Sequence, residues 1–359
     1  MTNQNCNSFF DFKQSLEDII ASQSKLIGSV QTMIEVRDDE SNQTPREAVY
    51  KDDKLVLYHY KKQAKEVSKV PTLIIYALVN TPAMMDISQD KSFIKKLLED
   101  GMDLYLIEWG FPTADDKFIT LDDYINDYID GCVDYILEST KSKTLNILGV
   151  CQGGTLSVIY TALHSEKVKN LITMVTPIDF STNDGLLFKW GKHINADELV
   201  NAYGVVPGEV MNTGFLTLKP LSLMVNKYMD LIDDLDNVDS MTSFMTMEKW
   251  IFNSPGQAGE AFRQFINDLY HNNKLIQGTM KIGDKTVDLK KIKQPLLNVY
   301  AEKDNQVPNA ASEPLGNYVS SKDVTTKCFP TGHIGMFVSG RSQKEVAPTI
   351  SKWAKEHSK

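Results

Sequence analysis

The chain has 359 residues, of which 42% are hydrophobic, so it is long enough to bury a large core. Its formal net charge of -9, without a basic patch interleaved with aromatic residues, argues against a nucleic-acid partner. No run approaches the roughly 18 apolar residues that a membrane span requires, so we expect no transmembrane segment.

The four cysteines form neither a CxxC pair nor the spacing of a metal site. Because the sequence does not begin with the pattern of a signal peptide, we expect reduced thiols in a cytoplasmic protein. We expect no bound metal and no cofactor. The cysteines are Cys6, Cys132, Cys151 and Cys328.

Residues 1–45 are predicted to form a helical arm separate from the core. Apolar residues recur at helical spacing from Phe9 to Val30, and the polar stretch Arg37–Thr44 follows them. The arm either packs on the core or offers a docking surface to a partner or an apolar product.

Residues 46–180 are predicted to form the first part of the core, in which strands and helices alternate. Such alternation implies a mostly parallel sheet with helices on both faces, and ligands bind such sheets at the carboxyl ends of the strands. The predicted strands are Leu55–Tyr60, Pro71–Val79, Met102–Trp109, Leu145–Val150 and Leu171–Val175. The first of them alternates like an edge strand, and the second has the continuous apolar run of a central strand. The predicted helices are Ser92–Leu98, one capped by Thr120, and Thr155–Leu163.

Clear strand patterns disappear between residues 181 and 273, where methionine and aromatic residues occur among mixed helical stretches. We expect a mainly helical cap over residues 181–285, closed by a hairpin at Thr279–Leu289. The apolar residues are either ordinary core or the underside of a mobile lid. The second part of the core, 286–359, is predicted to end with a helix at Ser342–His357.

The stretch 144–155 carries the strongest motif. An apolar strand ends at the sequence G-V-C-Q-G, after which a helix begins. This is the layout of a nucleophile elbow, with Cys151 in place of serine. Gly149 and Gly153 give room to the strained nucleophile, and Gly154 lets the helix pack close to the sheet. A buried structural cysteine is the alternative interpretation.

The order of two later residues supports the elbow. Asp304 follows the predicted strand Leu296–Tyr300, and His333 follows the predicted strand Val324–Phe329. Nucleophile, acid and histidine in this order are typical of the α/β-hydrolase fold, so we predict that fold with a triad of Cys151, Asp304 and His333. His333 would activate the thiol, and Asp304 would orient the imidazole and balance its charge.

The acid and the base are chosen by position. Of the six histidines, only His333 lies in a glycine-flanked loop after a late strand. Asp304 is preferred to Asp179 and Asp284 by its place in the order alone.

The tetrahedral intermediate needs two backbone donors. The N–H groups of Gln152, directly after the nucleophile, and of Val79, after an early strand, are predicted to form this oxyanion hole. A thiolate exchanges one thioester for another at little thermodynamic cost, so a cysteine suits an acyl-CoA donor. A cap that excludes water would favour an alcohol over hydrolysis, although a cysteine hydrolase could use the same triad.

Several segments together resemble polyhydroxyalkanoate synthases. Residues 149–155 resemble the lipase-like box of that family, and residues 76–86 resemble its oxyanion-strand segment. Residues 103–110, 269–275 and 332–340 are similar too, so that the resemblance covers roughly residues 45 to 357. The short length and the sequence H-I-G-M that begins at His333 resemble the two-component class III type.

The resemblance implies an acyltransferase that polymerises 3-hydroxyacyl-CoA, typically 3-hydroxybutyryl-CoA, and releases CoA, which is part of the substrate rather than a cofactor. Cys151 would hold the growing chain and His333 would activate it, while Asp304 would act either on His333 or on the substrate hydroxyl. The resemblance also implies an E-type partner subunit, a homodimer and residence on cytoplasmic polyester granules.

Three residues depart from the family pattern. Thr81 and Ala83 stand where the family often has arginine and a larger residue, and Glu108 stands where aspartate is common. We expect them near the site entrance, where they bear on substrate preference and partner dependence. Two alternative functions stay open, an acyl-CoA thioesterase of the same fold and a non-catalytic granule-binding homologue.

Overall fold

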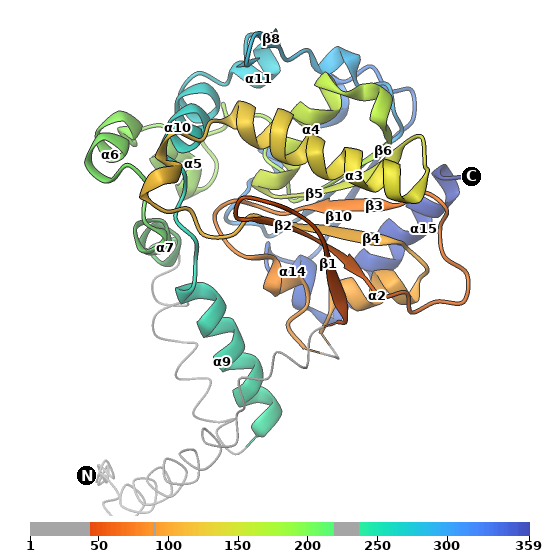
Figure 1. Ribbon diagram of the computed structural model, residues 1–359. Coiled ribbons are helices and arrows are strands. Elements are labelled where there is room, and N and C mark those ends of the chain that lie inside the picture. Colours follow the sequence, from red (N-terminus) through yellow and green to blue (C-terminus); the bar gives the residue numbers. More distant parts are fainter. Residues whose placement is uncertain (1–43, 89–90, 219–236) are drawn as a thin grey trace, which may run out of the picture. The chain divides into compact units, whose positions relative to one another are not determined.

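The structure is a computed structural model that describes residues 44–88, 91–218 and 237–359 (Figure 1). The predicted helical arm, residues 1–45, lies almost entirely outside the described residues. Among the described residues, no helix combines the length and the apolar character needed to cross a bilayer.

The chain divides into two compact units. One comprises residues 1–41 and 219–248, and the other comprises residues 42–218 and 249–359. In the first unit, the described residues form most of helix α9 (Val238–Phe252). The second unit contains the sheet and every candidate site residue.

An eight-stranded sheet forms the centre of the second unit, in the order β1-β2-β4-β3-β5-β6-β9-β10. β1 pairs antiparallel with β2 and β2 with β4, whereas all the other pairs are parallel. The mostly parallel sheet of an α/β-hydrolase is thereby confirmed. The strands are β1 (Arg46–Asp52), β2 (Leu55–Tyr60), β3 (Thr72–Ile75), β4 (Leu104–Glu108), β5 (Leu145–Val150), β6 (Val168–Met174), β9 (Leu296–Ala301) and β10 (Val324–Phe329).

Helices cover both faces of this sheet (Figure 1). α3 (Asp130–Thr140) and α4 (Gln152–Leu163) lie on one face, and α2 (Phe93–Glu99) and α15 (Ala347–His357) lie on the other. The shorter segments are η2 (Pro82–Met85), η3 (Ala114–Phe118), η4 (Asp123–Ile129), η5 (Ser165–Lys167), η8 (Leu289–Lys291), α12 (Asn309–Ser312), α13 (Leu315–Tyr318), α14 (Gly335–Val338) and η9 (Ser342–Val346).

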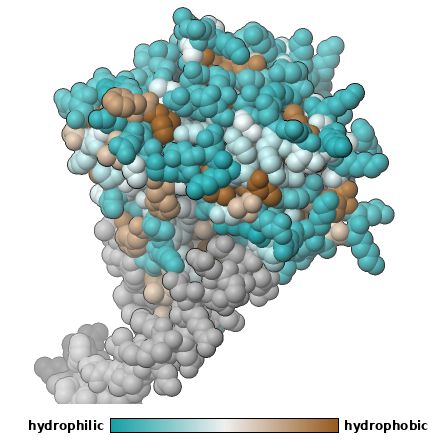
Figure 2. All heavy atoms as spheres, viewed as in Figure 1, coloured by the Kyte–Doolittle hydropathy of each residue, from teal (hydrophilic) through white to brown (hydrophobic). Residues whose placement is uncertain are grey.

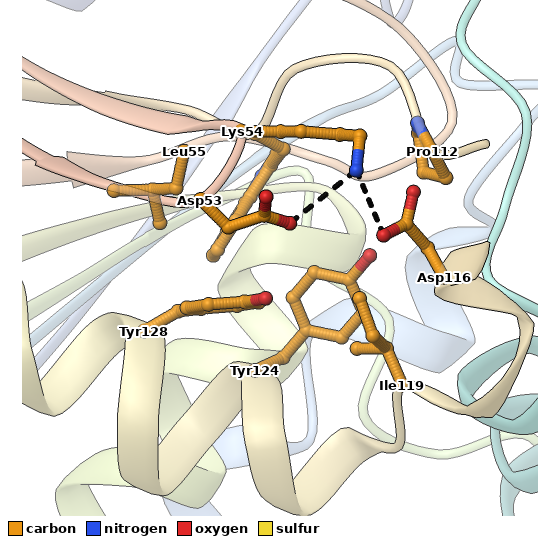
Figure 3. Close-up of a pocket in the computed structure, with 9 residues that line it drawn as sticks. Asp53, Lys54, Leu55, Pro112, Asp116, Ile119, Tyr124 and Tyr128 are labelled. Atoms are coloured by element: carbon orange, nitrogen blue, oxygen red, sulfur yellow. Dashed lines mark hydrogen bonds and ion pairs between the residues drawn. The ribbon is translucent and has the colours of Figure 1, made fainter.

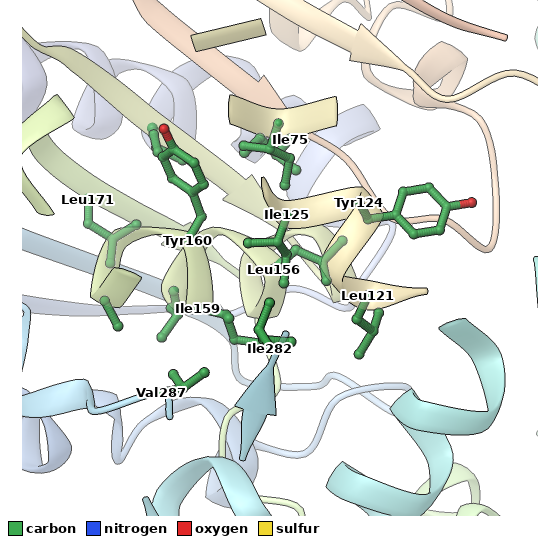
Figure 4. Packing of buried hydrophobic residues seen from close by; sticks show 14 of the residues in the cluster. Ile75, Leu121, Tyr124, Ile125, Leu156, Ile159, Tyr160, Leu171, Ile282 and Val287 are labelled. Carbon is green, nitrogen blue, oxygen red and sulfur yellow. The ribbon is translucent and has the colours of Figure 1, made fainter. Parts of the chain in front are cut away.

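The elbow helix α4 is buried almost throughout, and β5 before it is buried along its whole length. Leu156 and Ile159 of α4 lie among Ile125 of η4 and the hairpin residues Ile282 and Val287 (Figure 4). Each such side chain contributes about 1.5–3 kcal/mol when fully buried. The helix that follows the candidate nucleophile is therefore held firmly from several sides.

Strand β2 is not an edge of the sheet, so the interpretation of its alternating pattern was wrong. β1 pairs with β2 across a turn in which Asp53 has a φ of +47°. The sequence pattern predicts no strand there, because Arg46–Asp52 carries four charged residues. Charged side chains are common on edge strands, where they discourage pairing with other chains. The edges are therefore β1 and β10.

Among the described residues between β6 and the hairpin, the regular elements are helices joined by loops, apart from one isolated bridge between Val206 and Gln257. The two ends of this inserted segment are joined, because Asn273 Nδ2 donates to Asp179 Oδ1 at 2.9 Å. The cap boundaries 181–285 stay a prediction. The elements here are α5 (Leu186–Gly191), α6 (Ala196–Tyr203), α7 (Gly208–Leu216), α9, α10 (Gly259–Gln264), η7 (Phe265–His271), α11 (Lys274–Gln277), β7 (Lys281–Ile282) and β8 (Lys285–Thr286).

Candidate active site

Cys151 lies in the sharp turn between β5 and α4, as the elbow motif predicts. Its φ of +52° and ψ of -124° are unusual for a residue with a side chain and cost about 1–3 kcal/mol. The surrounding hydrogen bonds hold this conformation. Cys151 N donates to Met174 O at 2.9 Å, and Cys151 O accepts from Gly154 N at 2.9 Å.

Close packing explains the glycines that follow Cys151. A Cβ atom on Gly153 would collide with the carbonyl oxygen of Ile75, at the end of β3. A Cβ atom on Gly154 would collide with the side chain of Thr176. The turn can therefore reach the sheet closely only with glycine at both positions.

His333 and Asp304 form a short hydrogen bond in loops that follow β10 and β9. The distance between His333 Nδ1 and Asp304 Oδ2 is 2.7 Å, and the side chains are 7% and 1% exposed. The other carboxylate oxygen, Oδ1, accepts from the N–H groups of Gln306 and Val307 at 2.8 and 2.9 Å. Because an ionised carboxylate only accepts, Nδ1 carries the proton of this bond.

His333 also contacts the candidate nucleophile. Asp304 engages Nδ1, which leaves Nε2 as the ring nitrogen that can act on Cys151. Burial lowers the pKa of His333, but the charges of Asp304 and Cys151 and the hydrogen bonds to both raise it to about 10. The imidazole of His333 therefore lies beside the thiol that the elbow motif identifies as the candidate nucleophile. The structure thus brings the three predicted residues together at the carboxyl edge of the sheet.

The structure distinguishes Asp304 from Asp179 and Asp284, the two other aspartates considered as the acid of the triad. Asp179 accepts hydrogen bonds from Asn273 Nδ2 at 2.9 Å and from Tyr318 Oη at 3.1 Å. Asp284 lies exposed in the turn between β7 and β8. Of these three carboxylates, Asp304 is the one bonded to His333.

The predicted oxyanion donors lie in adjoining segments. β3 ends at Ile75, earlier than predicted, and residues 76–81 form a loop that contains Val79. Gln152 Oε1 accepts from Leu78 N at 3.0 Å, which ties this loop to the residue after the nucleophile. Within the described residues, the N–H groups of Val79 and Gln152 donate to no backbone carbonyl. The part of these two N–H groups in an oxyanion hole stays a prediction.

Two tyrosines that the triad motifs do not include lie near the thiol. Burial raises the pKa of Tyr76 and of Tyr270, and the charge of Cys151 raises each of them further. The Tyr270 ring packs on Phe180 and Phe188 with centroid distances of 4.9 and 5.3 Å. Both tyrosines belong to segments that resemble the synthase family, which is the one sequence signal that pointed to them.

A separate surface pocket lies beside the β1–β2 turn (Figure 3). In it, Lys54 Nζ lies 2.9 Å from Asp116 Oδ1 and 3.4 Å from Asp53 Oδ2, close to the ring of Tyr124. The three charged groups largely satisfy one another, and no triad residue lines the pocket. We assign this pocket no part in the chemistry.

Proteins that are similar to this chain in sequence or in structure have the fold described above. Residues 59–339 match the family described as alpha/beta hydrolase fold. A solved structure, a soluble variant of monoglyceride lipase from Saccharomyces cerevisiae in complex with a substrate analog, is 13% identical. It covers 88% of this chain and 96% of its own, with a TM-score of 0.58. The chain therefore has the α/β-hydrolase fold.

Two curated relatives cover almost the whole chain. The poly(3-hydroxyalkanoate) polymerase subunit PhaC of Allochromatium vinosum is 49% identical over 342 residues, which are 95% of this chain and 96% of the relative. The protein of the same name from Thiocystis violacea is 48% identical over 343 residues, 95% and 97% of the two chains. The chain belongs to the poly(3-hydroxyalkanoate) polymerase subunit PhaC family, which confirms the resemblance found in the sequence.

Proposed function

We propose that this protein polymerises short-chain 3-hydroxyacyl-CoA, above all 3-hydroxybutyryl-CoA, into a polyester with release of CoA. The observation that carries the proposal is a cysteine on a strained elbow, beside a histidine that an aspartate holds. The names of the relatives support the polymerising activity.

In the first half of the reaction, the Cys151 thiolate attacks the thioester carbonyl of the substrate. The N–H groups of Val79 and Gln152 stabilise the resulting oxyanion. The bond between the carbonyl carbon and the CoA sulfur then breaks, and CoA leaves with the proton of the His333 imidazolium. The acyl group remains on Cys151 as a thioester.

In the second half, His333 takes the proton of an attacking 3-hydroxyl group. The hydroxyl oxygen forms an ester with the acyl carbon, and the bond from that carbon to the Cys151 sulfur breaks, which restores the thiolate. Each elongation cycle thus exchanges one thioester for one ester, and it requires no cofactor beyond the CoA carried by the substrate.

The same proposal includes an assembly and a location. The relatives are named as subunits, which supports an assembly with a further subunit. From the family resemblance we take this subunit to be of the E type, and we take this chain to form a homodimer. The apolar product would keep the enzyme at the surface of cytoplasmic polyester granules.

The test supplies 3-hydroxybutyryl-CoA to the purified protein, with and without an E-type subunit, and follows CoA release, turbidity and product mass. We expect CoA and polymer to form together. CoA released with only free 3-hydroxybutyrate would instead identify a thioesterase. Polymer yield that does not change in Cys151→Ala would identify a non-catalytic granule protein.

Replacing the nucleophile should have the largest effect on this activity. We expect Cys151→Ser to fold normally but to lower kcat by about 10⁴-fold or more, because a hydroxyl is the weaker nucleophile at this site. Cys328→Ser is the matched control, since Cys328 is an exposed free thiol on β10 and should leave kcat within about twofold. Wild-type turnover in Cys151→Ser would contradict the covalent route.

A further inference from the structure

Side chains from three separate elements hold the loop that contains Val79. Trp109 Nε1, just after β4, donates to Tyr76 O at 3.0 Å. Gln152 Oε1, at the start of α4, accepts from Leu78 N at 3.0 Å. Trp250 Nε1, in the last turn of α9, donates to Thr81 O at 2.8 Å.

These hydrogen bonds lie on both sides of Val79. Leu78 N–H is fixed one residue before it, and Thr81 C=O is fixed two residues after it. The loop has no strand partner of its own, because β3 ends at Ile75. Its conformation at Val79 therefore depends on these side chains rather than on the sheet.

Gln152 has two parts in this arrangement. Its own N–H group is one predicted oxyanion donor, and its side chain holds the residue next to the other donor, Val79. A single residue thus sets the spacing between the two donors. Donors that are fixed before the reaction need no reorganisation when the charge develops, which is the source of their effect on rate.

Building on the proposed function, we propose that Gln152, through its side chain, and Trp250 are positioning residues that hold the Val79 N–H toward the carbonyl oxygen of an acyl group on Cys151. Trp250 joins the inserted helical segment to this loop, so the alignment of the oxyanion hole depends on a residue outside the sheet. Neither side chain takes part in proton transfer.

The two test variants are Gln152→Met, which removes the acceptor at similar length, and Trp250→Phe, which removes the donor and keeps an aromatic ring. Acylation of Cys151 is measured from the burst of p-nitrophenol released by p-nitrophenyl butyrate. Alkylation of the same thiol by iodoacetamide is measured in parallel, because this reaction develops no oxyanion.

Loss of an oxyanion donor lowers rates by about 10²–10³-fold, and loosening one should cost less. We expect the acylation rate to fall about 10-fold to 100-fold in each variant, with the alkylation rate within about twofold of wild type. General damage to the site would lower both rates together, and that result would overturn the proposal, as would unchanged acylation.

The chain offers two matched controls. Gln264 Oε1 accepts from Leu121 N at 2.7 Å, and Trp353 Nε1 donates to Thr325 Oγ1 at 3.2 Å. Gln264→Met and Trp353→Phe remove the same kinds of hydrogen bond elsewhere, and should leave the ratio of the acylation rate to the alkylation rate unchanged. A ratio that falls as far in these controls would also overturn the proposal.

The same variants separate this inference from the proposed function. If p-nitrophenyl butyrate acylates Cys151 but 3-hydroxybutyryl-CoA does not, the proposed substrate is wrong. The ratio of the acylation rate to the alkylation rate then still decides whether Gln152 and Trp250 are positioning residues. If neither compound acylates the wild-type protein, both proposals fail.

Discussion

Two of the histidine–aspartate pairs among the described residues, His333 with Asp304 and His59 with Asp103, differ more in their surroundings than in their geometry. His333 Nδ1 lies 2.7 Å from Asp304 Oδ2, and His59 Nε2 lies 2.9 Å from Asp103 Oδ1. The first pair is almost fully buried, whereas the His59 side chain is 29% exposed and stacks on Tyr105 at 4.1 Å.

Position in the sheet makes the difference. Asp304 and His333 follow the carboxyl ends of parallel strands, where Cys151 also lies. Asp103 precedes β4, at the amino end of that strand. A histidine–aspartate pair alone therefore does not mark an active site. Only the pair next to the cysteine on the strained turn is a candidate for catalysis.

The largest contrast is expected from the imidazoles. His333→Gln should lower kcat by about 10⁴-fold or more, because in the proposed mechanism His333 activates Cys151 and protonates the leaving CoA. His59→Gln should leave kcat within about twofold and lower the free energy of unfolding by about 1 kcal/mol or less. The measurements are steady-state CoA release and urea denaturation. Comparable losses of kcat in both variants would erase the distinction between the pairs.

The aspartates should show a smaller contrast. Asp304→Asn should lower kcat by about 10²–10⁴-fold, since the neutral amide no longer fixes the imidazole tautomer or balances its charge. Asp103→Asn should leave kcat within about twofold. Thermal unfolding of both variants controls for misfolding. An Asp304→Asn enzyme with normal kcat would mean that His333 needs no orienting group.

The pH dependence of stability should sharpen the comparison further. The pKa of His333 is about 10 in the folded protein, above the value of about 6.5 of an unfolded histidine. Its protonation therefore stabilises the fold fully below pH 6.5, and this contribution is lost as the pH rises through 10. The difference in free energy of unfolding between wild type and His333→Gln should shrink between pH 6.5 and 10. A difference that stays constant or grows would contradict the raised pKa.

Local patterns in the sequence were sufficient to predict much of the fold. The limits of β2, β5 and β10 match the apolar runs Leu55–Tyr60, Leu145–Val150 and Val324–Phe329. Thr120 begins a helix, as its capping pattern predicts, with Asp123 Oδ2 accepting from Thr120 N at 2.6 Å. The elbow could be found because strain, glycines and nucleophile fall within a few consecutive residues.

Contacts between residues that are distant in the sequence could not be predicted from such local patterns. Asp304 could be chosen over Asp179 only by its order in the chain, since all that separates them is which loop approaches His333. The bonds from Trp250 to Thr81 and from Leu78 to Gln152 span 169 and 74 residues, and no local periodicity encodes them.

The double use of the Asp304 carboxylate limits what this residue can do in the proposed reaction. One oxygen is occupied by the backbone of its own loop and the other by the imidazole, and the side chain is 1% exposed. Because the carboxylate is buried and both of its oxygens are already engaged, it is poorly placed to accept a proton from an incoming monomer. Under the proposed mechanism, each new hydroxyl would lose its proton to the ring of His333, so that a single base would serve both thiol activation and chain growth, and the two halves of the cycle would have to alternate.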